Sequence, residues 1–410
     1  MYNTVSIVWP TRTIKQYAPV LLCVAFWAAT AFGQKSPQTI VLNGEKLNSN
    51  LHALSGNSEP VLTAALRDIT VIADKLVKAG KLFSVMNKEQ VPPSGNKHDY
   101  MSQAPYWWPD PAKPTGLPYI RRDGDRNPEL NKISDSAEMG NVIADAETLA
   151  VAYYFTGDER YAKQGAAVIR TWFLDAKKRQ NPNLNFAQGI PGINKGRGIG
   201  LIETRELYRV IDAAILIQGS KSWTASDHAG LRSWFSDFLT WMTESSLGKD
   251  EADEKNNHGT YYDVQVIAYS LFVGKPDIAR KQIEITKQRI GSQIEPDGSQ
   301  PHELARTLSW GYTNMNLRGF FTIARLAENA GVDLWNYKTS DGRGIKKAVE
   351  WLVPYAKNEK KWTHEQIKPR KFDQTAEILS IASRKFKQTD YESLAKSLEA
   401  VPDVIERLTS

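Results

Sequence analysis

The stretch "AETLAVAYYFTGDERYAKQGAAVIRTWFL" (Ala146–Leu174) carries apolar residues at helical spacing on both sides of Gly157 and Asp158. Glycine commonly ends a helix in the left-handed conformation, and aspartate commonly caps the start of the next helix. The stretch therefore predicts two antiparallel helices joined by a tight turn.

The same kind of unit recurs further along the chain. "QVIAYSLFVGKPDIARKQIEITKQRI" (Gln265–Ile290) has Gly274 as a stop signal and Pro276 near the next start. A third, looser copy runs over Arg318–Gly331, and residues 61–85 also repeat apolar positions at the spacing of one helix face. Repeated helix pairs without intervening strands predict an all-α fold, either a helical toroid or a solenoid.

Residues 1–33 have the composition of an export signal. Arg12 and Lys15 precede an apolar run that ends in small residues matching cleavage signatures before Gln34. The run is too short for a membrane span, and a leucine before Cys23 disfavours a lipoprotein signal. We therefore expect a signal peptide over residues 1–33, a single domain over residues 34–410, no membrane association after processing, and a periplasmic or secreted location.

The composition excludes several classes of protein. Hydrophobic residues at 41% and charged residues at 24% argue against disorder. Loss of the signal would remove the only cysteine, Cys23, and would lower the formal net charge of +6 by two, to +4. A modest positive excess fits an anionic partner. The basic residues are scattered along the chain, so we expect no nucleic-acid binding.

The triplet Asn256-Asn257-His258 stands directly before a helical pattern that places Val264, Ile267 and Leu271 on one face. The free N–H groups at a helix N-terminus favour anions, and asparagine amides add donors. The triplet is therefore a candidate cradle for a carboxylate. The simpler interpretation, a helix cap followed by a packed histidine, explains the triplet about equally well.

A second candidate group lies in "SQPHELARTLSWGYTNMN" (Ser299–Asn316). Arg306 and Tyr312 can share a face if one helix runs through both. An arginine fork binds carboxylates, and nearby positive charge lowers the pKa of a tyrosine. The pair fits removal of a weakly acidic C–H proton, although a tyrosine packed by its ring remains a strong alternative.

A long irregular stretch, Pro92–Pro128, holds the segment "HDYMSQAPYWWPDP". Loops of this length in compact domains are usually functional. Tyr106, Trp107 and Trp108 lie between prolines, and stacked aromatic rings suit pyranose sugars. We expect an aromatic lid or subsite wall, with His98 either contacting substrate or anchoring the loop.

A glycine-rich segment, residues 185–207, lacks the spacing of a phosphate-binding motif and is expected to have no strand before it. It is better explained as a loop that brings Gln188, Arg197 or Glu203 toward a cleft. No zinc, calcium or serine-hydrolase motif is present, and Asp123–Glu129 is better explained as a turn than as a metal site. We expect no metal and no cofactor.

Together, Asn257-His258, Arg306 and Tyr312 in "ARTLSWGY", and the segments "APYWWPDP" and "PDGSQPHELART" resemble the alginate-lyase superfamily of polysaccharide lyases. The resemblance covers roughly residues 98–330 and is greatest to the branch that acts on glucuronan and alginate. The Gly-Thr-Tyr-Tyr after Asn-Asn-His differs from the better-known alginate lyases. The resemblance implies an (α/α) toroid and an anionic polysaccharide as substrate.

It also implies a β-elimination chemistry for four residues. Asn257, Arg306 and a protonated or hydrogen-bonding His258 would neutralise the uronate carboxylate, and Tyr312 would remove the C5 proton and return a proton to O4. His258 could instead assist as base for the C5 epimer, guluronate. Further substrate contacts are expected from neighbouring residues of these motifs and from the two loops: Tyr106, Trp107, Trp108, His98, Gln188, Arg197, Asn256, Tyr262 and Trp310.

Two rival functions remain open on the sequence. A toroidal glycoside hydrolase would need two carboxyl groups beside the scissile bond, and Glu203, Asp263, Glu295 and Asp297 are available. A non-catalytic, exported glycan-binding protein would bind the polymer without shortening it. Such a protein would have no reason to gather asparagine, histidine, arginine and tyrosine at one point.

Overall fold

The computed structural model describes residues 35–56, 59–398, 400 and 403–409. Every helix and strand described below lies in one compact unit that begins at Ser36. The predicted signal peptide, residues 1–33, lies outside the described residues. None of the helices within the described ranges is long and apolar enough to cross a membrane.

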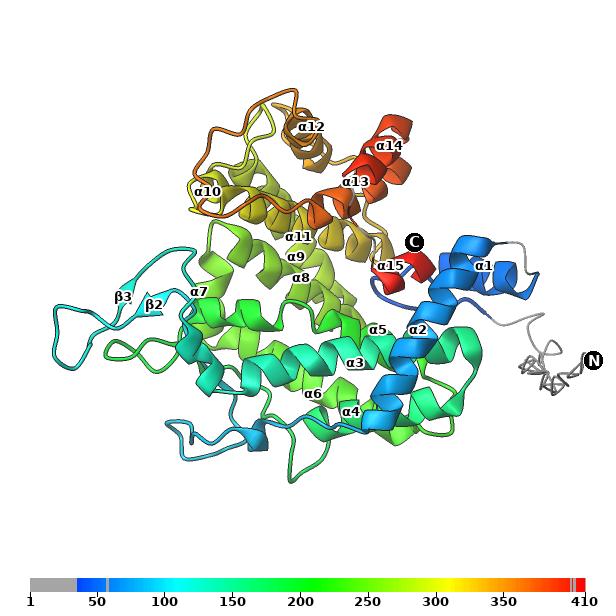
Figure 1. Ribbon diagram of the computed structural model, residues 1–410, viewed down its shortest axis with the longest axis horizontal. Helices are drawn as coiled ribbons and strands as arrows, with labels where there is room; N and C mark the ends of the chain where they lie inside the picture. Colours follow the sequence, from blue (N-terminus) through cyan, green and yellow to red (C-terminus); the bar gives the residue numbers. More distant parts are fainter. Residues whose placement is uncertain (1–34, 57–58, 399, 401–402, 410) are drawn as a thin grey trace, which may run out of the picture. The chain divides into compact units, whose positions relative to one another are not determined.

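This unit is built from helices that pack in two rows (Figure 1). The inner row consists of α3 (Asp135–Thr156), α5 (Tyr208–Leu216), α8 (Asn257–Phe272), α11 (Ser309–Asn329) and α13 (Asp373–Phe386), each packed against the next. The outer row consists of α4 (Glu159–Phe173), α6 (Ala225–Glu244), α9 (Pro276–Gln293), α12 (Ile345–Ala356) and α14 (Thr389–Ser397). Each outer helix covers at least one inner helix. This arrangement confirms the all-α prediction.

The remaining helices lie outside these two rows. Near the start of the unit lie α1 (Gly44–Ser55) and α2 (Pro60–Ala79), and both contact the C-terminal α15 (Val404–Thr409). The short helices α7 (Ser246–Asp253) and α10 (Pro301–Leu304) precede α8 and α11 along the chain. Helix α2 ends at Ala79, earlier than the predicted Val85, because Gly80 adopts the left-handed conformation with φ 56°.

Local capping sets the helix boundaries that the sequence predicts. Gly157 ends α3 with φ 69°, and the Asp158 side chain caps α4 by accepting a hydrogen bond from the N–H of Arg160. Gly274 likewise has φ 77° after α8, and Pro276 begins α9. Both predicted helix pairs are therefore confirmed.

The inner helices α3, α8 and α11 are buried over most of their circumference. In α8, the described residues from Gly259 to Ser270 are all buried. Such helices form the interior of large helical proteins, whereas surface helices show a single apolar stripe. Because neighbouring elements pack around these helices, their N-terminal ends are held in place. The N-terminal ends of α8 and α11 carry candidate residues.

The long segment before α3 is less irregular than the sequence indicates. Strand β1 (Met101–Gln103) pairs in parallel with β4 (Phe186–Gly189), and β2 (Trp107–Trp108) pairs antiparallel with β3 (Ile120–Arg121). The hairpin of β2 and β3 extends away from the helices in Figure 1. Strand β4 lies inside the glycine-rich segment, residues 185–207, and not before it. The sequence does not indicate this strand, because two to four residues are too few to show a strand period.

Candidate active site

A cavity of about 980 Å³ lies at the N-terminal ends of the inner helices. Its wall includes residues from the first turns of α3, α8, α11 and α13, from the segment before α5, and from the region of β1–β3. The polar and aromatic side chains that line the cavity include Tyr106, Trp107, Arg121, Arg126, Ser136, Gln188, Arg197, Glu203, Arg205, Glu206, Glu254, Asn256, Asn257, His258, Arg306, Trp310, Tyr312, Lys368, Lys371 and Asp373.

Asn256, Asn257 and His258 form the start of α8, as the sequence predicts. The Asn256 side chain caps the helix by accepting a hydrogen bond from the N–H of His258, at 2.9 Å. The backbone N–H and the side-chain amide of Asn257 both donate to the buried carboxyl group of Glu303, at 2.7 and 2.8 Å. Burial raises the pKa of Glu303 to about 7, although the bonds from Asn257 lower it. Glu303 therefore fixes the orientation of the Asn257 amide.

The His258 ring is held by a second buried carboxyl group. Its Nδ1 lies 3.0 Å from Oε1 of Glu251 in α7, and the Glu251 side chain has no exposed surface. Burial lowers the pKa of His258, but the charge and hydrogen bond of Glu251 act in the opposite direction. The pKa of His258 therefore lies above the ordinary value. The imidazolium form is therefore favoured at this position.

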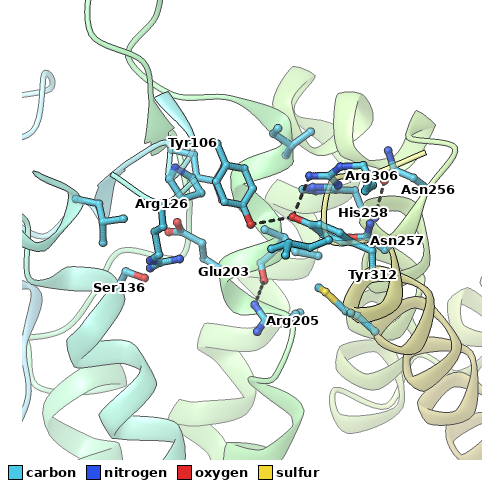
Figure 2. A pocket seen from close by; sticks show the side chains of 18 of the residues that line it. Tyr106, Arg126, Ser136, Glu203, Arg205, Asn256, Asn257, His258, Arg306 and Tyr312 are labelled. Carbon is cyan, nitrogen blue, oxygen red and sulfur yellow. Dashed lines mark hydrogen bonds between the residues drawn. The ribbon is translucent and has the colours of Figure 1, made fainter. Parts of the chain in front are cut away.

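Tyr312 lies in the first turn of α11, and its hydroxyl group has two partners (Figure 2). Its oxygen is 2.8 Å from the hydroxyl oxygen of Tyr106 and accepts a hydrogen bond from Nη2 of Arg306 at 2.9 Å. Burial raises the pKa of Tyr312, Tyr106 raises it further, and Arg306 opposes both. In the resting protein this phenol is therefore protonated and already in contact with a cation.

Arg306 does not lie on the helix that carries Tyr312. It falls in the connection between α10 and α11, so no continuous helix runs through both residues and the condition for a shared helix face is not met. The guanidinium carbon nevertheless lies 3.8 Å from the centroid of the Tyr312 ring. Nε and Nη2 also donate to the carboxylate of Asp123, at 3.1 and 2.7 Å. Much of the arginine fork is thus engaged within the protein.

The glycine-rich segment brings its three predicted residues to the cavity. Arg197 donates from Nη2 to the side-chain oxygen of Gln188 at 2.8 Å. Burial lowers the pKa of Arg197 to about 10, and the nearby Arg121 contributes to the shift. Glu203 accepts hydrogen bonds from the hydroxyl groups of Tyr100 and Ser102, at 2.5 and 2.7 Å. Figure 2 shows Glu203 and Arg126 on the side of the cavity opposite Asn257 and His258.

The predicted substrate-contacting residues divide into two groups. Tyr106, Trp107, Gln188, Arg197, Asn256 and Trp310 line the cavity. The structure does not bring the remaining three, His98, Trp108 and Tyr262, to its wall.

Each of these three has another partner. The His98 ring bonds the backbone carbonyl of Arg179 at 2.6 Å, which agrees with the anchoring alternative. The Trp108 indole donates to the carbonyl of Asp125, and the buried Tyr262 donates to that of Met242. Trp310 lines the cavity yet is almost fully buried, because its ring packs in an aromatic cluster.

Several residues that hold the cavity side chains in place have no local signal in the sequence. Asp123 was expected only to form a turn, and it meets Arg306 across 183 residues. Glu251 and Glu303 are buried acids whose partners become apparent only in three dimensions. Among the lining residues, basic side chains outnumber carboxyl groups; the basic ones are Arg121, Arg126, Arg197, Arg205, Arg306, Lys368 and Lys371.

The structure does not bring any two of the four proposed acidic residues together at the cavity, as a glycoside hydrolase would require. Of these four, only Glu203 lines the cavity. Asp263 is buried in an ion pair with Arg289, and Glu295 lies 3.4 Å from Arg343. Within the described ranges, no group of three or more His, Cys, Asp or Glu residues could hold a metal ion.

Comparison with known proteins shows the family to which this chain belongs. A family model described as alginate lyase matches residues 84–362. An alginate lyase from Bacteroides ovatus, known from its crystal structure, has 40% sequence identity to this chain. The match covers 91% of this chain and 99% of that chain, with a TM-score of 0.85. A search of curated proteins finds no match.

More distant structures share the architecture. An alginate lyase from a Sphingomonas species is 17% identical, with a TM-score of 0.54 over 84% of this chain and 94% of that chain. A variant of an alginate lyase complexed with a tetrasaccharide, also 17% identical, has a TM-score of 0.56. These likenesses show the (α/α) toroid fold. Since the family model spans more than half of the sequence and a 40% identical relative is matched along nearly its whole length, the chain belongs to the alginate lyase family and is a polysaccharide lyase.

Proposed function

We propose that the protein cleaves β-1,4-linked polyuronates, glucuronan or alginate, by β-elimination at this cavity. The observation that carries the proposal is the meeting of Asn257, His258, Arg306 and Tyr312 at one wall. The relatives described as alginate lyases support the class of substrate. A polyuronate carries one negative charge on each sugar, which suits a cavity rich in basic side chains.

The first requirement of the reaction is neutralisation of the uronate carboxylate. The C5 proton is barely acidic beside an ionised carboxylate, because the transition state gathers a second negative charge. At the start of α8, the second side-chain N–H of Asn257, beyond the one bonded to Glu303, and the His258 imidazolium both favour an anion. Groups fixed in advance at the position of developing charge are the most effective stabilisers of such a transition state.

The second requirement is a base close to C5. We assign this role to Tyr312, which first releases its own hydroxyl proton to solvent; the hydrogen bond from Arg306 then stabilises the phenolate that takes the C5 proton. In β-mannuronate and β-glucuronate the C5 hydrogen and O4 lie on the same side of the ring, so Tyr312 can take the first proton and protonate the leaving oxygen. For guluronate, the opposite epimer at C5, His258 is the alternative base.

Removal of the C5 proton and protonation of O4 together account for only part of the rate enhancement. General acid–base catalysis contributes about 10²–10⁴-fold, so neutralisation of the carboxylate must supply much of the rest. Neighbouring sugars would contact the aromatic rings of Tyr106 and Trp107 and the polar groups of Gln188, Arg197 and Asn256. Aromatic rings suit the flat faces of pyranoses.

The test is a substrate panel followed by ultraviolet absorbance. Elimination creates a C4=C5 double bond that absorbs, so the purified protein should raise the absorbance with glucuronan or with mannuronate-rich or guluronate-rich alginate. Hyaluronan and pectate serve as polyuronate controls. New reducing ends without absorbance would instead indicate a hydrolase, and binding without shortening would indicate a glycan-binding protein.

We also propose that residues 1–33 are removed as a signal peptide and that the domain of residues 34–410 acts in the periplasm or outside the cell. The support is the charged and apolar pattern of residues 1–33. N-terminal sequencing of the protein from its native host tests the proposal, and a mature chain that begins at Gln34 is expected.

A further inference from the structure

The carboxylate of Asp123 contacts three residues, Arg121, Arg306 and Thr307, and the two arginines line the cavity. Oδ1 accepts hydrogen bonds from Arg306 and Arg121, at 2.7 and 2.8 Å, and Oδ2 accepts from Nε of Arg306 at 3.1 Å. The hydroxyl group of Thr307 also donates to Oδ2 at 3.1 Å. The side chains of Asp123 and Arg306 are only 20% and 18% exposed. A fork held at both carboxylate oxygens is a strong and directional contact.

The loop that carries Asp123 is pressed closely against the connection before α11. Thr307 donates to the backbone carbonyl of Asp123 at 3.0 Å. Gly124 has φ +74°, and a Cβ atom at that position would lie 2.5 Å from Oγ1 of Thr307. The position therefore favours glycine both by its backbone conformation and by the available space. Asp123 is thus held in place by Thr307 and by the close packing of the neighbouring Gly124.

The same guanidinium also contacts the proposed base. Nη2 of Arg306, which donates to Asp123, also donates to the hydroxyl oxygen of Tyr312 at 2.9 Å. The guanidinium carbon lies 3.8 Å from the centre of the Tyr312 ring. The three side chains therefore form one chain of contacts, from carboxylate to guanidinium to phenol.

We propose that Asp123 is a positioning residue for the elimination: it holds the Arg306 guanidinium against Tyr312, so that a donor is already in place when the phenolate forms. Asp123 itself touches neither Tyr312 nor, in this role, the substrate. Without the carboxylate, the long arginine side chain can leave the phenol and adopt other rotamers. Small losses of alignment at a reacting group are costly because the remaining geometry cannot compensate.

This role gives Arg306 a different task from binding the uronate carboxylate. Two of its nitrogen atoms are engaged by Asp123, and one of these two also bonds Tyr312. Neutralisation of the substrate charge then falls mainly on the side chains of Asn257 and His258. The inference rests on the proposed elimination, since it assigns Asp123 to the base of that reaction.

The test is Asp123→Asn in the full protein, with kcat and KM measured separately on the best polyuronate of the panel. Asparagine keeps the shape but can no longer accept both arms of the arginine fork. We expect kcat to fall by about tenfold or more with KM within about twofold, the pattern of an interaction made mainly in the transition state. Thermal unfolding of each variant checks that it folds.

Two further variants separate positioning from loop anchoring. Thr307→Val removes the hydroxyl bonds to Asp123 but leaves the fork intact, and its kcat should stay within about twofold of the wild type. In an Arg306→Lys background, where the fork is already lost, Asp123→Asn should lower kcat by less than about threefold, because residues that act through one contact are not additive. If Asp123→Asn does not fold, Asp123→Glu, which displaces the fork by one methylene, replaces it and should also lower kcat.

Each contrary result overturns the inference in a distinct way. An unchanged kcat in the Asp123 variant shows that Arg306 needs no such support. An equal loss in the Arg306→Lys background shows that Asp123 acts elsewhere, and an equal loss in Thr307→Val shows that it only anchors the loop. A wild-type protein that forms no unsaturated product on any polyuronate contradicts the proposed function, and the inference then falls with it.

Discussion

The hydroxyl oxygen atoms of Tyr106 and Tyr312 lie 2.8 Å apart, although the two residues are 206 positions apart in the sequence. Tyr106 precedes the hairpin of β2 and β3, whereas Tyr312 begins α11. Arg306 is the other partner of the Tyr312 hydroxyl group. The phenol proposed as base is therefore held from two separate parts of the chain.

Tyr106→Phe should weaken catalysis without abolishing it. The variant keeps the aromatic ring but removes one of the two hydrogen bonds to Tyr312, and the bond from Arg306 remains. We expect a decrease in kcat of about three- to tenfold, the order of a single neutral hydrogen bond at about 1 kcal/mol. Initial rates of absorbance increase measure the effect. An unchanged kcat would show that Tyr106 contributes only its ring, and Tyr119→Phe, outside the cavity wall, is the matched control.

Asn257→Ala should lower kcat strongly. The substitution removes the amide that Glu303 orients and that we assign to the uronate carboxylate. Loss of one preorganised donor to a developing charge typically costs about 10²–10³-fold in kcat, and we expect a loss of this order. The exposed Asn336, bonded only locally to Asp333, provides the control Asn336→Ala. A loss of less than tenfold in the Asn257 variant would exclude a main role for its amide.

Glu251→Gln should move the alkaline limit of activity to lower pH. Burial lowers the pKa of His258, and Glu251 raises it beyond its ordinary value, so the imidazolium persists to higher pH than in an ordinary histidine. Without the Glu251 carboxylate the burial effect is less opposed, the pKa falls, and the charged form is lost at lower pH. Profiles of kcat/KM against pH for both proteins measure this shift. An alkaline limit that does not move would show that the charge of His258 is not required.

The buried ion pair of Lys88 and Asp135 should matter for stability and not for chemistry. The two side chains have no exposed surface and lie 3.0 Å apart. Lys88 also donates to the carbonyl groups of Val85 and Lys97 and so holds the segment before β1. Lys88→Met should lower the free energy of unfolding by about 3–5 kcal/mol, because it leaves Asp135 as a buried charge without its partner.

A double variant provides the control for that prediction. Burial raises the pKa of Asp135 to about 6 even with Lys88 present, so this carboxyl group is costly to keep ionised. Adding Asp135→Asn to Lys88→Met should therefore recover part of the lost stability. Denaturant unfolding measures the free energy of unfolding of the single and double variants. A double variant that loses as much free energy of unfolding as the two single variants added together would contradict the account.

The sequence predicts those features that depend on neighbouring residues. Gly157 and Asp158 define the turn between α3 and α4 through local backbone conformation and a local cap. Asn256 caps α8 for the same reason. These signals act within one helical turn, and the sequence displays them directly.

The remaining features depend on contacts between distant segments. Asp123 was expected to form a turn, and its partner Arg306 is identified only once the loop and the α10–α11 connection lie together. The sequence allows Arg306 and Tyr312 to share a face only if one helix runs through both, yet they meet although the helix is not continuous between them. Tyr262 stands near the motif in sequence, but the helical rotation turns its side chain into the core. Tertiary packing decides each of these cases.

The measurement that tests the central claim most directly is the rate of unsaturated product formation by Tyr312→Phe. The variant keeps the ring and its contact with Arg306 but has no group that can accept the C5 proton. With mannuronate-rich alginate or glucuronan, whichever the wild type prefers, kcat should fall by about 10³-fold or more, within the range of acid–base catalysis. A correctly folded variant that still generates absorbing product at a rate close to the wild type would contradict the account.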